Sequence, residues 1–139
     1  DGSTYIAEDT DQSPGIIWGA NGNITTSSGI GQGQTNTTNM VANDPTENAG
    51  TICNDLIDSD GYDDWHLPSE DELAAMYDNL KAKGLGEFTS AYYWSSTDSQ
   101  SDRAEAIDFT SGNKASGSNR NRTNTYRVRA IRSFVSAPE

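Results

Sequence analysis

The sequence predicts a single α+β domain, because helical patterns in its middle part are followed by strand-like patterns in its last third. At 139 residues the chain is long enough for one hydrophobic core and too short for two domains of ordinary size. Three Trp, six Tyr and three Phe supply the large apolar side chains that a small core needs and that a disordered chain lacks. Helices and antiparallel strands that are segregated along the chain are typical of the α+β class.

The first predicted helix begins at Asp44. Asp44 is expected to cap it, Pro45 suits the first helical turn, and Glu47 can bond back to the N–H group of the cap. Its inward-facing residues are expected to be Ala49, Ile52, Cys53 and Leu56.

A second, stronger helical pattern begins at Ser69. Ser69 and Glu72 have the spacing of a capping box, and Gly84 is a natural stop. The apolar stripe at helical spacing, which predicts a buried face, consists of Leu73, Met76, Tyr77 and Leu80.

Short strands are predicted on both sides of the helices. The strand-like segments are residues 3–7, 15–18, 91–97, 104–109 and 126–134. In the last of them apolar and basic residues alternate, which predicts one buried face and one solvent-facing basic face. The buried positions are Tyr126, Val128 and Ala130, and the basic positions are Arg127 and Arg129. Residues 19–43, rich in Gly, Asn, Ser and Thr, are expected to form a long loop.

The net charge of −12 is distributed unevenly along the chain. Residues 1–80 contain fifteen Asp or Glu and no Lys or Arg, whereas residues 81–139 contain all nine basic residues and six acidic ones. The simpler interpretation is that the acidic part neutralises basic strands of the same fold. The alternative is a patch that attracts sulfated glycans or phosphates, formed by Arg103, Lys114, Arg120 and Arg122. The negative net charge disfavours nucleic acid as a partner.

Two lone residues could indicate chemistry, and each has a simpler structural interpretation. Cys53 is the only cysteine, so no intrachain disulfide can form, and a small buried side chain is expected there. His66 is the only histidine and lies between Trp65 and Leu67, which favours a structural role over a Ser-His-Asp relay or a zinc site. We therefore assign no catalytic residue.

The acidic run from Asp58 to Asp64 is similar to the front of a calcium loop. Its register fails, because placing Gly61 at the sixth position of an EF-hand loop puts leucines at the first and last ligand positions. Turn formation explains the Asp-Gly pair equally well. No metal and no cofactor are expected. No run of eighteen apolar residues and no signal-peptide pattern is present, so no direct insertion into a membrane is expected.

Three sequence blocks carry a resemblance to a known family. They are residues 61–73 (GYDDWHLPSEDEL), 93–96 (YWSS) and 128–132 (VRAIR). In this order and at this spacing they resemble the C-terminal ligand-binding domain of bacterial collagen-like surface adhesins, a family within the C-type lectin fold. The same branch of that fold includes the formylglycine-generating enzymes and the variable proteins of diversity-generating retroelements.

The resemblance implies a C-type lectin fold over a single domain of residues 1–139, in which two helices pack on a small twisted antiparallel sheet with long loops. It places residues 31–37 in a recurring structural loop. It also implies a non-enzymatic binding module at an extracellular location, on a cell surface or on a virion surface. Formylglycine-generating enzymes use a pair of cysteines for copper-dependent oxidation, and Cys53 alone does not match that pattern. The calcium-binding Glu-Pro-Asn and Trp-Asn-Asp signatures of sugar-binding C-type lectins are absent from the sequence.

The ligand-binding residues are predicted mainly in the polar stretch 97–124, on a scaffold of residues 1–96 and 125–139. Polar side chains on a rigid scaffold form an adaptable hydrogen-bonding surface, although an ordinary solvated loop has a similar composition. The predicted ligand-binding residues are Tyr92, Asp98, Ser99, Ser101, Asp102, Arg103, Glu105, Asp108, Thr110, Ser111, Asn113, Ser116, Ser118, Asn119, Arg120, Asn121, Arg122 and Asn124. Tyr92 is expected to be a rigid aromatic anchor, and the arginines offer forked donors to carboxylates or sulfates.

A comparison with retroelement-diversified proteins gives the first functional hypothesis. In those proteins the variable residues lie between a fixed Trp-Ser-Ser block and a fixed Val-Arg-x-x-Arg end. Mutation of template adenines turns Asn codons into codons for Ser, Thr, Asp, Gly, Ala, Arg or Tyr, and residues 97–124 are rich in these types. The first hypothesis is therefore a diversified receptor or adhesion domain for a protein or glycan on another cell or host surface. The alternatives are an invariant bacterial adhesin that binds sulfated or acidic polysaccharide, and a residual enzyme of the formylglycine-generating type.

Overall fold

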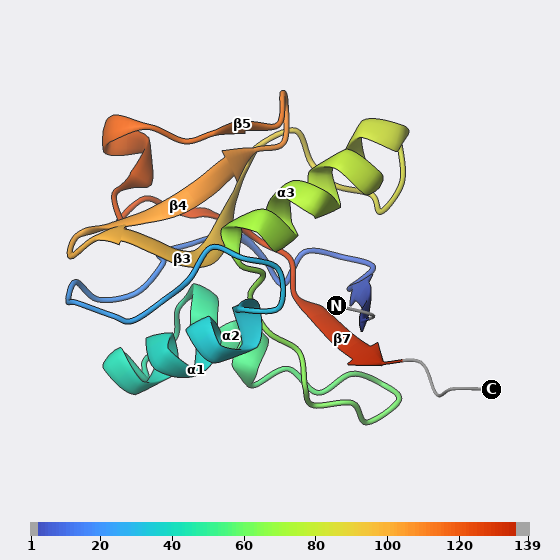
Figure 1. Cartoon of the computed structure of the whole chain (residues 1–139), viewed down its shortest axis with the longest axis horizontal. Coiled ribbons are helices and arrows are strands. Elements are labelled where there is room, and N and C mark those ends of the chain that lie inside the picture. Colours follow the sequence, from blue (N-terminus) through green and yellow to red (C-terminus); the bar gives the residue numbers. More distant parts are fainter. Residues whose placement is uncertain (1–2, 136–139) are drawn as a thin grey trace.

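The structure is a computed structural model that describes residues 3–135, and it confirms the α+β class (Figure 1). Residues 1–2 and 136–139 of the predicted domain lie outside the described residues. A five-stranded sheet has the strand order β2-β6-β3-β4-β5. Its strands are β2 (Ser13–Ile16), β6 (Tyr126–Val128), β3 (Tyr92–Gln100), β4 (Arg103–Asp108) and β5 (Asn113–Lys114). Its neighbouring strands are antiparallel except β3 and β6, which run parallel, so the expected fully antiparallel sheet is wrong at this pair.

A separate two-stranded ribbon pairs the first strand with the last one. In this ribbon β1 (Ser3–Ala7) runs antiparallel to β7 (Ile131–Val135). The predicted strands at residues 3–7, 91–97 and 104–109 are confirmed, with ends that differ by at most three residues. The segment predicted at 15–18 begins and ends two residues earlier, as β2.

Three α-helices and two short 3₁₀ turns complete the fold. They are α1 (Gly33–Asn43), α2 (Ala49–Asn54), α3 (Glu70–Asn79), η1 (Lys81–Lys83) and η2 (Gly117–Arg120). In Figure 1, α3 lies in front of the sheet, α1 and α2 lie together below it, and the β1–β7 ribbon is at the lower right. Within residues 3–135, no helix has the length and apolar character required to cross a membrane.

Helix α1 lies inside the segment that was predicted to be a loop, so that prediction is wrong. Its buried residues recur at helical spacing but are mainly polar: Gly33, Asn36, Thr37 and Met40. The Asn36 side chain bonds the N–H and the carbonyl of Ser27, and Thr37 bonds the backbone of Leu67. A helix whose buried face is hydrogen-bonded instead of apolar has no hydrophobic periodicity that a sequence pattern could reveal.

Helix α2 begins at Ala49, and the predicted start at Asp44 is wrong. The N–H of Asp44 bonds the carbonyl of Met40 at 2.9 Å and closes α1, while its carboxylate bonds Thr46. Asn48 is the actual cap and forms a capping box with Thr51. Of the expected inner residues, Ala49 and Cys53 are buried, whereas Ile52 and Leu56 are partly buried.

Helix α3 confirms the prediction that it begins after Ser69. The Ser69 hydroxyl accepts from the N–H of Glu72 at 3.3 Å, and the Glu72 carboxylate accepts from the N–H of Ser69 at 2.9 Å. The helix ends at Asn79, before the predicted stop, and Gly84, with φ of 73°, ends the following η1 turn instead. On its inner face Leu73 and Met76 are buried.

The buried residues form two clusters, one on each side of the sheet. One cluster lies under α3 and contains Leu73, Met76, Tyr93, Ile107, Phe109 and Ile131. The other joins the sheet to α1 and α2, and its large members are Trp18, Met40, Trp65, Leu67, Trp94 and Val128. The three blocks that carry the family resemblance therefore supply most of the large core side chains.

The predicted strand at 126–134 is divided into β6 and β7, which belong to different sheets. The expected solvent exposure of Arg129 is wrong, because the chain changes sheets there and the side chain turns inward. Its guanidinium bonds the carbonyls of Glu8 at 2.9 Å, Gly86 at 2.7 Å and Glu87 at 3.1 Å. Arg129 thereby ties β7 to the loops around it.

Candidate binding face

The predicted binding residues lie on and around the β3–β4 hairpin, β5 and the η2 turn. We call the surface that these residues form the polar face. Those that are exposed are Ser101, Asp102, Thr110, Ser111, Asn113, Ser116, Ser118 and Asn119. Those that are partly exposed are Tyr92, Asp98, Ser99, Arg103, Glu105, Asp108, Arg120, Asn121 and Asn124. Arg122 is the remaining one, and it is buried.

The η2 turn is fixed to the sheet by aromatic hydroxyl groups. The Asn119 side-chain amide donates to the Tyr92 hydroxyl at 3.3 Å, and the Tyr126 hydroxyl donates to the Asn119 carbonyl at 2.9 Å. The two tyrosine rings stack with centroids 4.8 Å apart. Tyr92 therefore holds the turn through its hydroxyl and packs one ring face on Tyr126, so only part of it is available as the predicted ligand anchor.

A second attachment of η2 runs through Arg120. Its guanidinium donates to the Ser99 hydroxyl at 2.8 Å and lies 3.4 Å from the Glu105 carboxylate. Nearby, the Lys114 ammonium pairs with the Glu70 carboxylate at 2.9 Å. Lys114 and Arg120, two members of the predicted anion-attracting patch, thus contact carboxylates, and a third member, Arg122, lies 3.8 Å from the Asp98 carboxylate.

Arg122 corrects the predicted site, because its side chain is fully buried and faces the backbone instead of a ligand. Its guanidinium donates to four carbonyls, at 2.9 Å, 3.1 Å, 2.7 Å and 3.1 Å. The acceptors belong to Ala20, Gly22, Gln100 and Arg103. Burial lowers the pKa of Arg122, although an arginine still remains charged near neutral pH. Arg122 is therefore a clamp between the loop at residues 20–22 and the β3–β4 hairpin.

The clamp also contains an aromatic and an acidic group. The guanidinium of Arg122 lies 4.4 Å from the ring centroid of Trp18 and 3.8 Å from the carboxylate of Asp98. Asp98 in turn accepts from the Thr26 hydroxyl at 2.6 Å. The predicted ligand-binding role of Asp98 is thus shared with a structural one.

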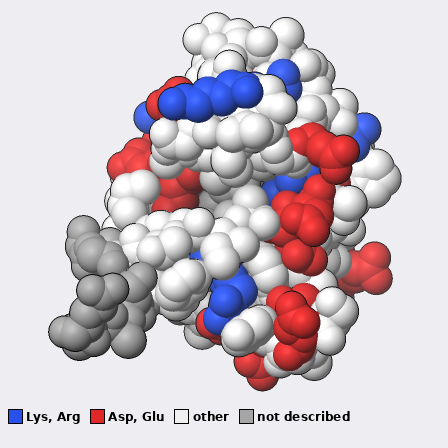
Figure 2. Space-filling model, turned by 90° about the vertical axis from the view of Figure 1, so that its right-hand side faces the viewer, with Lys and Arg blue, Asp and Glu red and all other residues white. Residues whose placement is uncertain are grey.

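The simpler interpretation of the charge asymmetry is confirmed by ion pairs between the two parts of the chain. Asp11 pairs with Arg127 at 3.0 Å and with Arg129 at 2.9 Å, and Asp64 pairs with Arg132 at 2.7 Å. On the face shown in Figure 2, several basic side chains lie next to acidic ones. The acidic part therefore neutralises the basic strands of the same fold.

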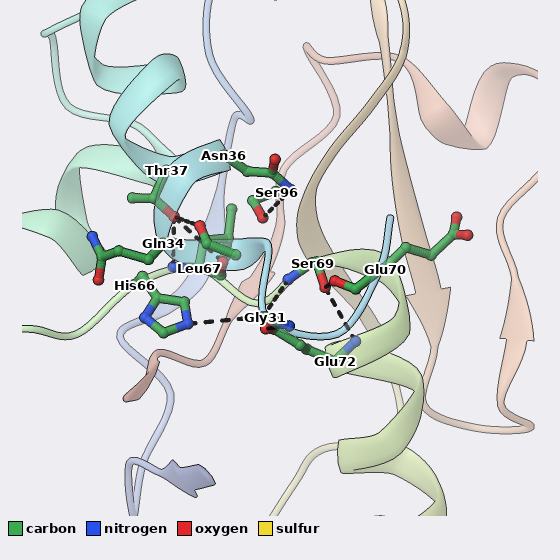
Figure 3. A network of polar contacts seen from close by, with 12 residues as sticks. Gly31, Gln34, Asn36, Thr37, His66, Leu67, Ser69, Glu70, Glu72 and Ser96 are labelled. Atoms are coloured by element: carbon green, nitrogen blue, oxygen red, sulfur yellow. Dashed lines mark hydrogen bonds and ion pairs between the residues drawn. The ribbon is translucent and has the colours of Figure 1, made fainter. Parts of the chain in front are cut away.

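A polar network holds the loop before α1 against α3 (Figure 3). The Glu72 carboxylate accepts from the N–H of Gly31 at 2.8 Å and lies 3.8 Å from the His66 ring. Burial opposes ionisation of Glu72, but the nearby His66 ring and the hydrogen bonds from Ser69 and Gly31 outweigh it and lower the pKa of Glu72. The backbone of His66 pairs with Ile131, so this histidine serves the scaffold.

The acidic loop and the cysteine have structural roles in the described residues. One Asp58 oxygen accepts from the N–H groups of Asp60 and Tyr62, and the other accepts from the Trp65 indole at 3.0 Å. In residues 3–135 no group of three or more His, Cys, Asp or Glu side chains is placed to hold a metal ion. Burial raises the pKa of the Cys53 thiol, which disfavours the reactive thiolate.

The three sequence blocks that supply the core and the residues of the polar face lie in the part of the chain that matches one protein-family model. Residues 9–132 match the model of the Lcl C-terminal domain family. The chain belongs to the Lcl C-terminal domain family. This match confirms the family-level resemblance that the three sequence blocks carry. No curated protein matches the chain. In this Lcl C-terminal domain, the match includes every residue of the polar face.

Proposed function

We propose that this chain is a non-enzymatic ligand-binding domain of the receptor or adhesion type, and that the polar face is its binding surface. The observation that carries the proposal is the construction of the face, in which exposed Ser, Thr, Asn and Asp side chains stand on a hairpin and a turn that are held by the Tyr92 hydroxyl and by the buried Arg122 side chain. A preorganised surface loses little conformational entropy when a partner binds. Membership of the Lcl C-terminal domain family is consistent with an adhesion-type role.

The partner in this proposal is a protein or glycan on another cell or on a host surface, and recognition occurs outside the cell. A protein partner of standard size contacts roughly 800 Å² on each side. Such a contact can extend from the β3–β4 turn at Ser101 across η2 to the β4–β5 turn at Ser111. The net charge of −12 repels the phosphates of nucleic acids, so they are not proposed as partners.

We propose further that the exposed positions are diversified by a retroelement on a C-type lectin scaffold. Within residues 97–124 the exposed positions are mostly Ser, Thr, Asn and Asp, which mutation of adenines in Asn codons can produce. Ala104, Ile107 and Phe109 of the same stretch are buried beneath them. Exposed side chains can change without loss of packing, whereas buried ones cannot.

Deep sequencing of the encoding DNA from a natural population tests this proposal, together with a search for a near-copy beside a reverse transcriptase gene. Diversification predicts substitutions at template adenines of exposed codons such as those of Ser116, Ser118 and Asn119. Arg122 and Phe109 provide the matched control, because they lie in the same stretch and are buried, so they stay constant. A uniform sequence without a template copy would contradict diversification and favour an invariant adhesin.

The polysaccharide-binding alternative is less well supported by the arrangement of charges. Lys114 and Arg120 are paired with carboxylates, and Arg122 is buried. A sulfated glycan would have to displace those carboxylates, which offsets part of the gain from binding the sulfate groups. We therefore rank this function below recognition by surface complementarity.

A further inference from the structure

The carboxylate of Glu70 has one satisfied and one unsatisfied oxygen. Its Oε1 accepts from the Lys114 ammonium at 2.9 Å. Its Oε2 is buried and finds no hydrogen-bond partner among the described residues. Figure 3 shows the Glu70 side chain pointing away from the network around Glu72, toward the strands. A buried acceptor without a donor costs free energy, so a missing partner is expected at this oxygen.

Glu105 on β4 is the group that can supply the missing donor. Glu70 pairs with Lys114, which lies opposite Ile107 of β4. Glu105 is two residues before Ile107 and points to the same side of that strand, so the carboxyl groups of Glu70 and Glu105 face each other. Two carboxylates in contact do not both ionise easily, because their charges repel in a partly buried place. A proton on Glu105 removes this repulsion and gives Glu70 Oε2 the donor that it lacks.

We propose that Glu70 and Glu105 share a single proton that fastens the polar face to α3, and that loss of this proton as the pH rises weakens ligand binding by the face. The shared proton follows from the side chains alone. Its consequence for binding rests on the function proposed above.

The charged groups around the pair decide which of the two carboxyls holds the proton. Lys114 on β5 contacts Glu70, Arg120 on η2 contacts Glu105, and Asp71 on α3 acts on Lys114. Burial raises the pKa of Glu70, but contact with the Glu105 carboxyl and with Lys114 outweighs it and lowers the pKa. Burial and then the Glu70 charge raise the pKa of Glu105. The proton therefore resides on Glu105.

The same proton affects η2 because Glu105 also holds Arg120. The Arg120 guanidinium spans the Glu105 carboxylate, at 3.4 Å, and the Ser99 hydroxyl, at 2.8 Å. The Glu105 side chain is 21% exposed and can rotate into solvent. When Glu105 ionises, repulsion from Glu70 favours rotation of the carboxylate away from α3, and the attraction of the Arg120 guanidinium to that carboxylate moves η2 with it.

An NMR titration of the ligand-free chain tests the shared proton. We expect the side-chain carboxyl carbon of Glu105 to titrate above the ordinary range of a glutamate and that of Glu70 below it. The amide signals of Lys114 and Arg120 should move with the Glu105 transition. In Glu105→Gln the new amide donates to Glu70 Oε2 and its carbonyl still accepts from Arg120, so these amide shifts should disappear. Asp78→Asn, an exposed position on α3 outside the polar face, is the matched control and should keep the wild-type profile.

Two results would overturn the shared proton. One is titration of both glutamates at ordinary pKa values without coupled amide shifts. The other is displacement of the same amide signals by added CaCl₂, reversed by EDTA, because a cation would then fill the position assigned to the proton.

Binding is measured separately, with a display library randomised at Asn113, Ser116 and Ser118 and selected on immobilised lysozyme. For a selected clone we expect Kd to increase about fivefold across the Glu105 transition, the lower end of typical coupling between sites. The increase should vanish in the Glu105→Gln form of that clone. A coupled titration with an unchanged Kd would overturn the effect on binding. If the titration is coupled but the library yields no binder, the results would support the shared proton and count against the proposed function.

Discussion

Replacement of Arg122 by alanine should destabilise the domain severely. The substitution removes four hydrogen bonds to backbone carbonyls and the contact with the Trp18 ring. Each hydrogen bond contributes about 1 kcal/mol, and the carbonyls are left buried without donors. We therefore expect the free energy of unfolding to fall by about 4 kcal/mol. This is a large fraction of the 5–15 kcal/mol typical of small domains, and it corresponds to a decrease in Tm of roughly 10–20 °C.

Two further variants distinguish the stability lost with the Arg122 clamp from the stability lost with a positive charge alone. Arg122→Lys keeps the charge but has one donor group that reaches fewer carbonyls, so we expect about half of the alanine effect. Arg120→Ala removes a partly exposed arginine from the same segment and should cost about 1 kcal/mol or less. Urea unfolding followed by tryptophan fluorescence measures all three. Equal losses for Arg122→Ala and Arg120→Ala would refute the clamp and return Arg122 to the ligand-facing residues.

Four other predictions follow from contacts in the structure. Gly33→Ala should cost about 2–3 kcal/mol in chemical unfolding, since its Cβ would collide with the Glu72 carboxylate and the His66 ring, whereas Gly29→Ala, with its nearest contact at 3.8 Å, should be close to neutral. Because the pKa of Glu105 is raised in the folded state, its contribution to the free energy of unfolding is complete below pH 4.5 and is lost as the pH rises through the folded-state pKa. Unfolding curves measured over a pH series should show this decline in the wild type and should not show it in Glu105→Gln. The wild type should elute from heparin resin at low salt, while the double variant Glu70→Gln and Glu105→Gln, which removes the carboxylate charges that offset Lys114 and Arg120, should elute later; equal elution would argue against cation pairing. The thiol should react with Ellman's reagent only after unfolding, and rapid reaction of the native chain would contradict its burial.

Features with a local cause could be predicted from the sequence, and features with a distant cause could not. The start of α3 was predictable because Ser69 and Glu72 are three residues apart and satisfy each other. The cap of α2 was misplaced because Asp44 and Asn48 are both good capping types. The choice between them depends on α1, whose last turn consumes the N–H of Asp44.

The candidate site shows the same division. The polar composition of residues 110–119 agrees with the exposure of most of these residues, although Ala115 among them is buried. The burial of Arg122 and Arg129 was not predictable, because it depends on carbonyl groups far away in the chain, such as those of Ala20 and Glu8. An arginine in an Asn- and Ser-rich stretch has the same sequence context whether its side chain faces solvent or donates hydrogen bonds to the backbone carbonyls of a loop.

The pairing of β1 with β7 determines how this domain can be attached to other proteins. The two strands run antiparallel and side by side, with Ser3 opposite Val135, so these two residues lie at the same end of the domain. In Figure 1 this end lies at the lower right, and the η2 turn lies at the upper left. A single stalk, or insertion into a surface loop of a carrier protein, would therefore point the polar face outward without obstructing it. The domain is thus suited to use as a grafted display module.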